Sequence, residues 1–364
     1  MRYAVIIIGV CLILIASFIS VQFLIASKSQ TGLKETLAQR PTTTPTTTPT
    51  ELPLPIGRHF VIGHWANTSV ASTTALIKKH NLGGVIIMSA PDTIDDITAW
   101  TAEWQRAVDY PLIIAIDQEG GEVSRLRGTE YDLTSQRDIT TTETAHIVGS
   151  NRGRELAKLG ITMNMAPVVD YSEKADSFLF RRSFPNIEQV PEFATAMIVG
   201  MNEHHVIAVP KHFPGHPDDQ TDSHHSLPRI AMDKTALLSS LTPWQQIIEK
   251  AAPTAIMTAH VQFPAIDRNY PATLSSYFLR EVLRDYLGFA GLIITDDMSM
   301  DAIDNEWPAE VASRLALEAG ADIILYAALP YDIEKAITYL TTHPLSTSTK
   351  NASDARLRNF AATQ

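Results

Sequence analysis

Cysteine is almost absent from this sequence. Among 364 residues only Cys11 is a cysteine, and it lies near the amino terminus inside an apolar run. A disulfide framework and a thiolate metal site are therefore excluded for the rest of the chain. Any bound metal would need histidine and carboxylate ligands.

Positive charge is also scarce. The formal net charge is -11 at pH 7, and no basic run or stripe of Lys and Arg occurs in the body of the sequence. Because nucleic acids are bound through cationic contacts to phosphate, we expect no nucleic-acid partner. The composition, 45% hydrophobic and 19% charged, is that of a globular protein with one large domain or two small ones.

A long hydrophobic run occurs once, at the amino terminus. The stretch YAVIIIGVCLILIASFISVQFLIA, from Tyr3 to Ala26, carries no charge. A helix of about 20 apolar residues crosses the hydrocarbon core of a membrane, whereas a secretory signal has an apolar region of only about 7–15 residues. A lipoprotein signal at Cys11 is disfavoured because Val10 is bulky where a small residue is needed. We therefore predict an uncleaved transmembrane anchor over residues 1–27.

Proline and threonine dominate the following segment, PTTTPTTTPTELPLP from Pro41 to Pro55. This composition is typical of a semi-extended linker and not of a helix. We predict a linker at 28–55 and a folded domain at 56–364. A stalk of this kind favours a membrane-anchored protein whose folded domain lies outside the cytoplasm.

Short apolar runs recur along the domain, each followed by polar residues and then an amphipathic stretch. Such near-continuous runs mark strands covered on both faces, as parallel strands are. Eight of them occur, at His59–Trp65, Gly83–Ser89, Pro111–Asp117, Ile161–Asp170, Val206–His212, Thr254–His260, Gly291–Asp297 and Ala321–Ala327. The stretches between them accommodate crossover helices, for example at Ala71–His80, Glu143–Leu159 and Pro308–Glu318.

Eight β/α units predict an α/β fold, a single (β/α)8 TIM-type barrel. A doubly wound open sheet is the competing arrangement. It would need a Gly-rich dinucleotide turn after the first strand, and Ile62–Ser69 contains none.

Titratable side chains stand at the ends of five of the eight predicted strands. They are Asp117, Asp170, the pair Lys211 and His212, His260, and Asp296. Active sites in (β/α)8 barrels lie at the carboxyl ends of the strands. A capping aspartate or a buried structural histidine explains any one of these residues, but five equivalent positions together predict a polar active site of mixed charge.

The segment KHFPGHPDDQTDSHHSLP, from Lys211 to Pro228, is too rich in Pro, Gly and Asp for a helix or strand. A metal site is one interpretation, since the segment offers the ligands His212, His216, Asp222, His224 and His225. It is disfavoured because no pair has the HExxH spacing and Lys211 would place a cation beside the metal. Proton transfer is the other interpretation, because a carboxylate two residues before a histidine can orient the imidazole and stabilise its charged form. Asp222 and His224 supply that pair, and Asp296 is the candidate nucleophile across the site.

These motifs resemble those of glycoside hydrolase family 3, in its β-N-acetylhexosaminidase branch. The resemblance covers most of the chain after the linker and includes IDQEGGEVSRL (Ile116–Leu126), NMAPVVD (Asn164–Asp170), RSF (Arg182–Phe184), KHFPGH with DSHHSLP (Lys211–Pro228), MTAHVQFPAID (Met257–Asp267) and GFAGLIITDDMSM (Gly288–Met300). The KHFPGH and DSH elements are the most specific. Glucosidase members of the family take a glutamate from an additional carboxyl-terminal domain, and we expect no such domain in this chain.

The resemblance implies a role for each matching residue. Asp296 corresponds to the nucleophile, His224 to the general acid/base and Asp222 to the carboxylate that supports it. The residues that match positions holding the sugar in subsite -1 are Asp117, Arg125, Arg182, Lys211 and His212. Asp297 is expected to be a structural hydrogen-bonding partner, and no metal or cofactor is implied.

The implied activity is retaining hydrolysis of terminal β-N-acetylglucosaminides by a glycosyl-enzyme route, acting on cell-wall (peptidoglycan) fragments or chitooligosaccharides. Two alternatives remain open. One is a phosphorolytic β-N-acetylglucosaminidase, because a histidine acid/base does not repel phosphate as a carboxylate does. The other is an inactive cell-wall-binding barrel.

Three residues depart from the family pattern. Glu122 replaces an arginine of EGGRVQR, which reverses one charge at the mouth of the site. Pro185 and Pro217 stand where glycine is usual, and each restricts the backbone of its loop. None of the three removes an expected catalytic group.

Overall fold

A computed structural model of the chain describes residues 52–90, 93–216, 223, 225–327 and 330–364. Eight parallel strands form its main sheet in the order β7-β6-β3-β2-β1-β10-β9-β8. Backbone hydrogen bonds from Met257 to Pro210 (3.1 Å) and from Phe213 to Met257 (2.8 Å) join the two ends of this order. The sheet therefore closes into the predicted barrel. Its strands are β1 (Phe60–His64), β2 (Gly84–Ile87), β3 (Ile113–Ile116), β6 (Met163–Asn164), β7 (Ile207–Ala208), β8 (Ala255–Met257), β9 (Leu292–Asp297) and β10 (Ile323–Tyr326).

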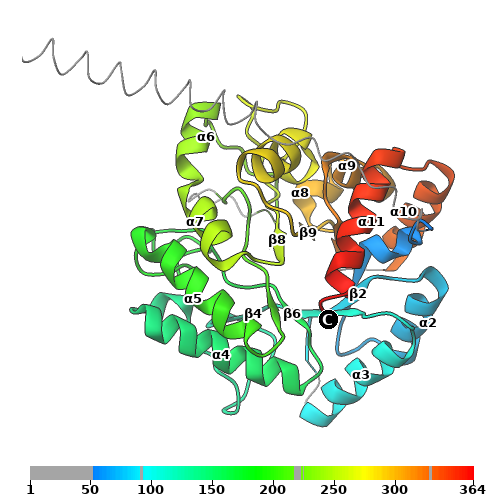
Figure 1. Cartoon of the computed structure of the whole chain (residues 1–364), viewed down its shortest axis with the longest axis horizontal. Helices are drawn as coiled ribbons and strands as arrows, with labels where there is room; N and C mark the ends of the chain where they lie inside the picture. Colours follow the sequence, from blue (N-terminus) through cyan, green and yellow to red (C-terminus); the bar gives the residue numbers. More distant parts are fainter. Residues whose placement is uncertain (1–51, 91–92, 217–222, 224, 328–329) are drawn as a thin grey trace, which may run out of the picture. The chain divides into compact units, whose positions relative to one another are not determined.

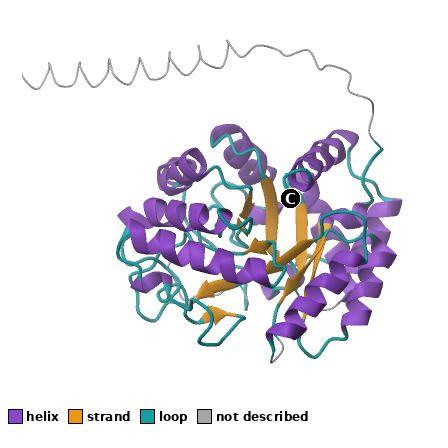
Figure 2. Cartoon of the chain, turned by 60° about the horizontal axis from the view of Figure 1, so that its bottom comes forward, coloured by secondary structure: helices purple, strands orange, loops and turns teal. Residues whose placement is uncertain are grey.

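Helices surround the strands, as Figures 1 and 2 show. The crossover helices include α2 (Val70–His80), α4 (Thr142–Lys158) and α9 (Ala309–Ala319), close to the three ranges predicted for them. The other helical elements are α3 (Ile94–Arg106), α5 (Val190–Asn202), α6 (Lys234–Ser240), α7 (Thr242–Ala251), a π-helical stretch η5 (Tyr277–Tyr286), α8 (Asp301–Asp304), α10 (Pro330–Thr342) and α11 (Thr347–Ala361). Short 3-10 turns occur at η1 (Ile56–His59), η2 (Gln136–Asp138), η3 (Ile187–Gln189) and η4 (Ala272–Leu274).

The strands are buried on both faces, which explains their continuous apolar runs. Successive residues of β1 belong to two separate apolar clusters, with Val61 in one and Ile62 in the other. One cluster fills the barrel and the other lies between strands and helices, as the alternation of side chains along a strand requires. Leu357 and Phe360 of α11 join the cluster inside the barrel. The last helix therefore closes the amino-terminal end of the barrel.

Charged residues at this amino-terminal end hold the fold together. Asp322, which precedes β10 and is fully buried, accepts hydrogen bonds from Arg284 (2.7 Å), Arg356 (2.9 Å) and Ser353 (2.7 Å). Ser353 and Arg356 lie on α11, and Arg284 lies on η5. This network fixes both helical elements to the barrel on the side away from the expected active site.

The transmembrane part of the fold prediction needs correction. In the part of the chain that the structure describes, no helix is both long and apolar enough to span a membrane. The longest helix there, α4, has 17 residues and is a crossover helix with polar and charged side chains, whereas a span needs about 20 apolar residues. The predicted anchor at 1–27 and most of the predicted linker lie outside the described residues.

Candidate active site

Side chains from distant parts of the sequence meet at the carboxyl ends of the strands. The ammonium of Lys211, which follows β7, donates a hydrogen bond to Asp117 after β3 (2.7 Å). Nε2 of the neighbouring His212 lies 3.9 Å from Oδ2 of Asp296 on β9. The barrel thus brings four of the predicted site residues together although the sequence separates them by up to 179 positions (296 − 117 = 179).

A buried carboxylate, Glu119, joins two of the predicted sugar-binding cations. Arg182 donates from Nε and Nη2 to the two oxygens of Glu119, each at 2.8 Å. Lys211 Nζ lies 2.7 Å from the same carboxylate and bridges it to Asp117. Burial alone would raise the pKa of Glu119, but Arg182 and Lys211 outweigh burial and hold that pKa far below its usual range. Glu119 is therefore a permanent anion that fixes both cations.

A short hairpin directly after β3 positions Glu119 and Arg125. It consists of β4 (Gln118–Gly120) and β5 (Val123–Ser124). The amide oxygen of Gln118 accepts from the backbone N–H groups of Arg125 and Leu126, both at 3.0 Å. Arg125 then reaches back to Asp117, with 3.3 Å between Nη2 and Oδ2. The turn needs a positive φ at Gly120 (87°), a conformation that favours glycine.

Asp170 orients His212. Its Oδ2 lies 2.5 Å from Nδ1 of His212 and accepts from the His212 backbone N–H at 3.2 Å. Its other oxygen accepts from the backbone N–H of His216 at 2.7 Å. Burial opposes ionisation of Asp170, but His212 and the other donors lower its pKa below the ordinary value. With Nδ1 held in this way, the imidazole presents Nε2 to Asp296.

The two consecutive aspartates at the end of β9 have different surroundings. Asp297 Oδ1 accepts from the Ser299 hydroxyl (2.6 Å), the Ser299 N–H (3.0 Å) and the Ala327 N–H (2.9 Å). Asp296 accepts the Asp297 backbone N–H at 2.8 Å and turns its second oxygen toward His212. Burial opposes its ionisation, but nearby His212, His260 and Lys211 lower the pKa of Asp296 to about 2. Asp296 is therefore a carboxylate at neutral pH, and Asp297 serves the local turn.

His260, three residues after β8, supports this turn. Its Nδ1 lies 3.0 Å from the Thr273 hydroxyl, and its Nε2 lies 3.0 Å from the Asp297 carbonyl oxygen. Burial lowers the pKa of His260, which favours the neutral imidazole. His260, which the sequence analysis singled out as a strand-end residue, is thus a buried structural histidine.

The predicted acid/base pair, Asp222 and His224, lies outside the described residues, as does Pro217. The residue between them, Ser223, is described and buried. Its carbonyl oxygen accepts a hydrogen bond from the Ala302 N–H at 3.3 Å. Ala302 belongs to α8, which directly follows β9. Ser223 therefore lies against the segment that follows the candidate nucleophile Asp296.

The structure brings together six of the eight predicted site residues: Asp117, Arg125, Arg182, Lys211, His212 and Asp296. Sequence reasoning missed Glu119 as a member of the site and gave no role to Asp170. The sequence does carry a signal for Glu119, because it lies two positions after Asp117 and side chains at this spacing share one face of an extended chain. Among the described residues, no group of three or more His, Cys, Asp or Glu side chains is arranged to hold a metal ion.

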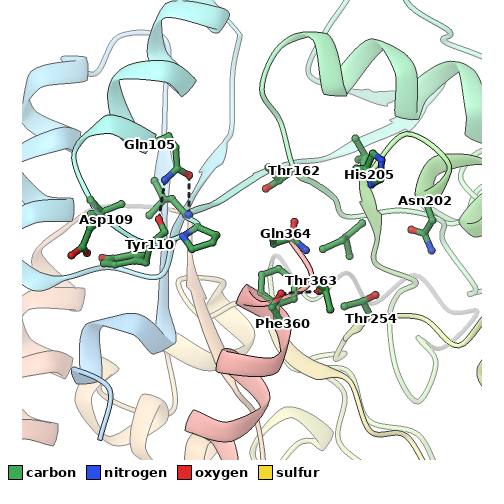
Figure 3. A pocket seen from close by; sticks show the side chains of 15 residues that line it. Gln105, Asp109, Tyr110, Thr162, Asn202, His205, Thr254, Phe360, Thr363 and Gln364 are labelled. Atoms are coloured by element: carbon green, nitrogen blue, oxygen red, sulfur yellow. Dashed lines mark hydrogen bonds between the residues drawn. The ribbon is translucent and has the colours of Figure 1, made fainter. Parts of the chain in front are cut away.

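A cavity of about 770 Å³ lies elsewhere, at the amino-terminal end of the barrel (Figure 3). It is lined by residues that precede β3 and β8 and by the end of α11, including Tyr110, Thr254 and Phe360. The Gln105 amide at its wall already bonds the backbone of Tyr110 and Leu112. This cavity lacks the convergent charged groups of the carboxyl end, so its volume does not make it the better candidate site.

Comparison with known proteins identifies relatives of this chain. The model of the glycosyl hydrolase family 3 N terminal domain matches residues 60–359. A beta-hexosaminidase of Alkalilimnicola ehrlichii is 33% identical over 280 residues, which cover 73% of this chain and 79% of that protein. Beta-hexosaminidase A of Pseudoalteromonas piscicida is 33% identical over 283 residues, and the match spans 69% of this chain but only 46% of that longer protein.

Solved structures give a consistent result. A glycoside hydrolase family 3 beta-N-acetylglucosaminidase from Paenibacillus superposes with a TM-score of 0.76 at 31% identity, covering 83% of this chain and 60% of that one. A beta-N-acetylhexosaminidase from Beutenbergia cavernae superposes with a TM-score of 0.77 at 26% identity, covering 84% of this chain and 97% of that one. The likeness therefore extends over the whole barrel.

Proposed function

The chain belongs to glycosyl hydrolase family 3, and from this membership and the site geometry we propose that it hydrolyses terminal β-N-acetylhexosaminide bonds with retention of configuration. It is a glycoside hydrolase of the β-N-acetylhexosaminidase type. One observation carries the mechanistic proposal. Asp296 is an ionised carboxylate at the carboxyl end of β9, beside His212, while its neighbour Asp297 is occupied by the turn.

In the first step Asp296 acts as the nucleophile. One of its oxygens forms a bond to the anomeric carbon while the bond from that carbon to the leaving oxygen breaks. The negative charge of Asp296 also stabilises the oxocarbenium-like transition state. Its pKa of about 2 keeps the carboxylate ionised across the physiological pH range.

The leaving oxygen needs a proton, and the described carboxylates of the site are poor sources of one. Glu119 and Asp170 are held ionised by the cations and donors around them. A separate group must therefore supply the proton, and we assign His224, supported by Asp222, to this task. The contact between Ser223 and Ala302 supports the assignment. Ser223 stands between Asp222 and His224 in the sequence, and this contact holds it next to the segment that follows Asp296.

In the second step His224 accepts a proton from water. The resulting hydroxide equivalent attacks the anomeric carbon, the ester to Asp296 breaks, and the sugar leaves with its original configuration. One histidine thus donates a proton to the leaving oxygen in the first step and takes another proton from water in the second, which requires a group whose pKa lies near the working pH.

The remaining predicted residues hold the sugar in subsite -1. The cations Arg182 and Lys211 are fixed by Glu119, and Arg125 is held by Asp117. Side chains held in this way can orient hydroxyl groups and the acetamide without losing much conformational entropy on binding.

The direct test is activity on 4-nitrophenyl β-N-acetylglucosaminide set beside the matching β-glucoside. The proposal predicts turnover of the first with a clear preference over the second. Preference for the glucoside, or turnover of neither, would contradict it. Product analysis with and without phosphate separates hydrolysis, which gives the free sugar, from phosphorolysis, which gives a sugar phosphate.

As natural substrates we propose cell-wall muropeptides or chitooligosaccharides with terminal N-acetylglucosamine, and we place the domain outside the cytoplasm. The Thr/Pro-rich stretch from Pro41 to Pro55 supports the location, since such linkers are typical of extracytoplasmic proteins. Cell fractionation with an antibody to the domain tests this placement.

A further inference from the structure

In the part of the chain that the structure describes, charged site residues gather at one side of the carboxyl end of the barrel, here called the charged half, and the opposite side, with β2, β1 and β10, is called the uncharged half. The charged groups of the site follow β3, β6 and β7 or, for Asp296, lie near the end of β9, whereas the sheet order places β2, β1 and β10 between β3 and β9. The described residues directly after these three strands, 65–69, 88–90 and 327, include no titratable side chain. In the closed ring of eight strands, β1 lies opposite β7, so its end faces Lys211 and His212 across the mouth.

An exposed tryptophan stands at the centre of this uncharged half. Trp65 directly follows β1, and 42% of its surface is exposed. Its indole N–H donates to the carbonyl oxygen of Ala327 at the end of β10 (2.9 Å). The only polar atom of the side chain is therefore satisfied by the protein, and what remains exposed is apolar ring surface.

The local sequence fixes this ring in place. Gly63 packs so closely on Ala327 that a Cβ atom there would lie 2.0 Å from the Ala327 oxygen. This close approach brings the indole of Trp65 within hydrogen-bonding distance of the Ala327 carbonyl oxygen. The next backbone N–H, that of Ala66, donates to the Ser89 hydroxyl after β2 (2.8 Å). Trp65 is thus held to both neighbouring strands.

The same peptide units connect Trp65 to the nucleophile. Ala327 accepts from the indole and donates its own N–H to Asp297 Oδ1 (2.9 Å). Asp297 in turn donates its backbone N–H to Asp296 (2.8 Å). A chain of three hydrogen bonds therefore sets the position of the ring relative to the reacting carboxylate.

We propose that Trp65 is a stacking platform for the sugar ring on the aglycone side of the cleaved bond. This inference rests on the proposed exo-acting function, because a terminal N-acetylhexosamine in the charged half leaves only the aglycone sugar to meet the uncharged half. The faces of a β-linked pyranose that carry axial C–H groups are apolar. An immobile aromatic ring buries such a face at little entropic cost. Trp65 would thus favour oligosaccharides over simple glycosides.

The test compares two substrates with similar alkyl leaving groups, N,N'-diacetylchitobiose and methyl β-N-acetylglucosaminide. Trp65→Ala should lower the ratio of their kcat/KM values, chitobiose over methyl glycoside, about tenfold. Trp65→Phe, which keeps a ring but loses the N–H anchor, should lower the ratio less. Tyr286→Ala is the matched control, because Tyr286 is 57% exposed but precedes β9 at the other end of the barrel. It should leave the ratio at the wild-type value.

A binding experiment separates failure of this inference from failure of the proposed function. In the Asp296→Asn background, calorimetry should show that Trp65→Ala weakens chitobiose binding relative to N-acetylglucosamine binding about tenfold. That result would support the platform even if the wild-type protein turned over neither substrate. The platform would be overturned if Trp65→Ala left both ratios, that of the kcat/KM values and that of the binding constants, within twofold of those of the protein that keeps Trp65. An equal loss for both ligands counts as such a result. This conclusion would hold whether or not the enzyme is a hexosaminidase.

Discussion

Replacing Glu119 by glutamine tests whether one buried carboxylate holds the sugar-binding cations. Glu119 is 1% exposed, and its oxygens receive two hydrogen bonds of 2.8 Å from Arg182 and one contact of 2.7 Å from Lys211. Glutamine keeps the shape but removes the charge and turns an NH2 group toward a cation. Breaking a buried ion pair by removing one partner costs about 3–5 kcal/mol, because the remaining charge stays buried without compensation.

A neighbouring pair of the same residue types provides the control. Arg181 and Glu122 form a single contact of 3.2 Å, and their side chains are 71% and 62% exposed. Solvent screens such a pair, so Glu122→Gln should cost at most about 0.5 kcal/mol. The two substitutions make the same chemical change three positions apart and differ in burial.

Thermal unfolding reads out both variants. For a unit of roughly 300 residues the entropy of unfolding makes 1 kcal/mol worth about 1.6 °C in Tm. Glu119→Gln should therefore lower Tm by roughly 5–8 °C and Glu122→Gln by less than about 1 °C. The same Glu119 variant should raise KM, since Arg182 and Lys211 lose their common anchor. Equal shifts in the two variants, or no shift for Glu119→Gln, would refute the assigned role.

Three further predictions concern titration, proton transfer and metal dependence. His64 is fully buried against Trp100 and Trp104, and burial lowers its pKa from 6.5 to about 4. Its neutral form therefore stabilises the fold above about pH 6.5, and roughly 2 kcal/mol of the free energy of unfolding is lost as the pH falls toward 4.5. A His64→Leu variant should lack this part of the pH dependence of Tm. His224→Ala should slow natural N-acetylglucosaminides far more than activated aryl glycosides, with Asp222→Ala milder, and an equal loss for both substrate types would make His224 a binding or structural residue. Treatment with EDTA should leave kcat/KM unchanged, whereas loss of activity that zinc restores would revive the metal interpretation of the Lys211–Pro228 segment.

The barrel was predictable because its strands are covered on both faces. Buried parallel strands need continuous apolar runs, so all eight could be located from the positions of these runs in the sequence. The helices α2, α4 and α9 agree with their predicted ranges to within a residue or two. The titratable residues at the ends of these runs could be read from the sequence in the same way. Lys211 and Asp117 could therefore be placed in one site before their contact was known.

The remaining parts of the site depend on geometry that no local pattern encodes. Glu119 belongs to the site because a hairpin pinned by Gln118 turns it toward Arg182, which lies 63 residues away in the sequence. Asp170 was recognised as a strand end, but its hold on His212 requires the barrel to close. His260 met the same sequence criterion as Asp296 and proved to be structural, because its two ring nitrogens are bonded to the Thr273 hydroxyl of η4 and to the Asp297 carbonyl oxygen.

The central claim is that Asp296 forms a covalent bond with the sugar, and trapping the glycosyl-enzyme tests it most directly. A fluorinated mechanism-based N-acetylglucosamine derivative should inactivate the protein and add one sugar mass, and peptide mapping by mass spectrometry should place that mass on Asp296. Asp296→Asn should take up no label. Label on Asp297 or on a glutamate would contradict the account.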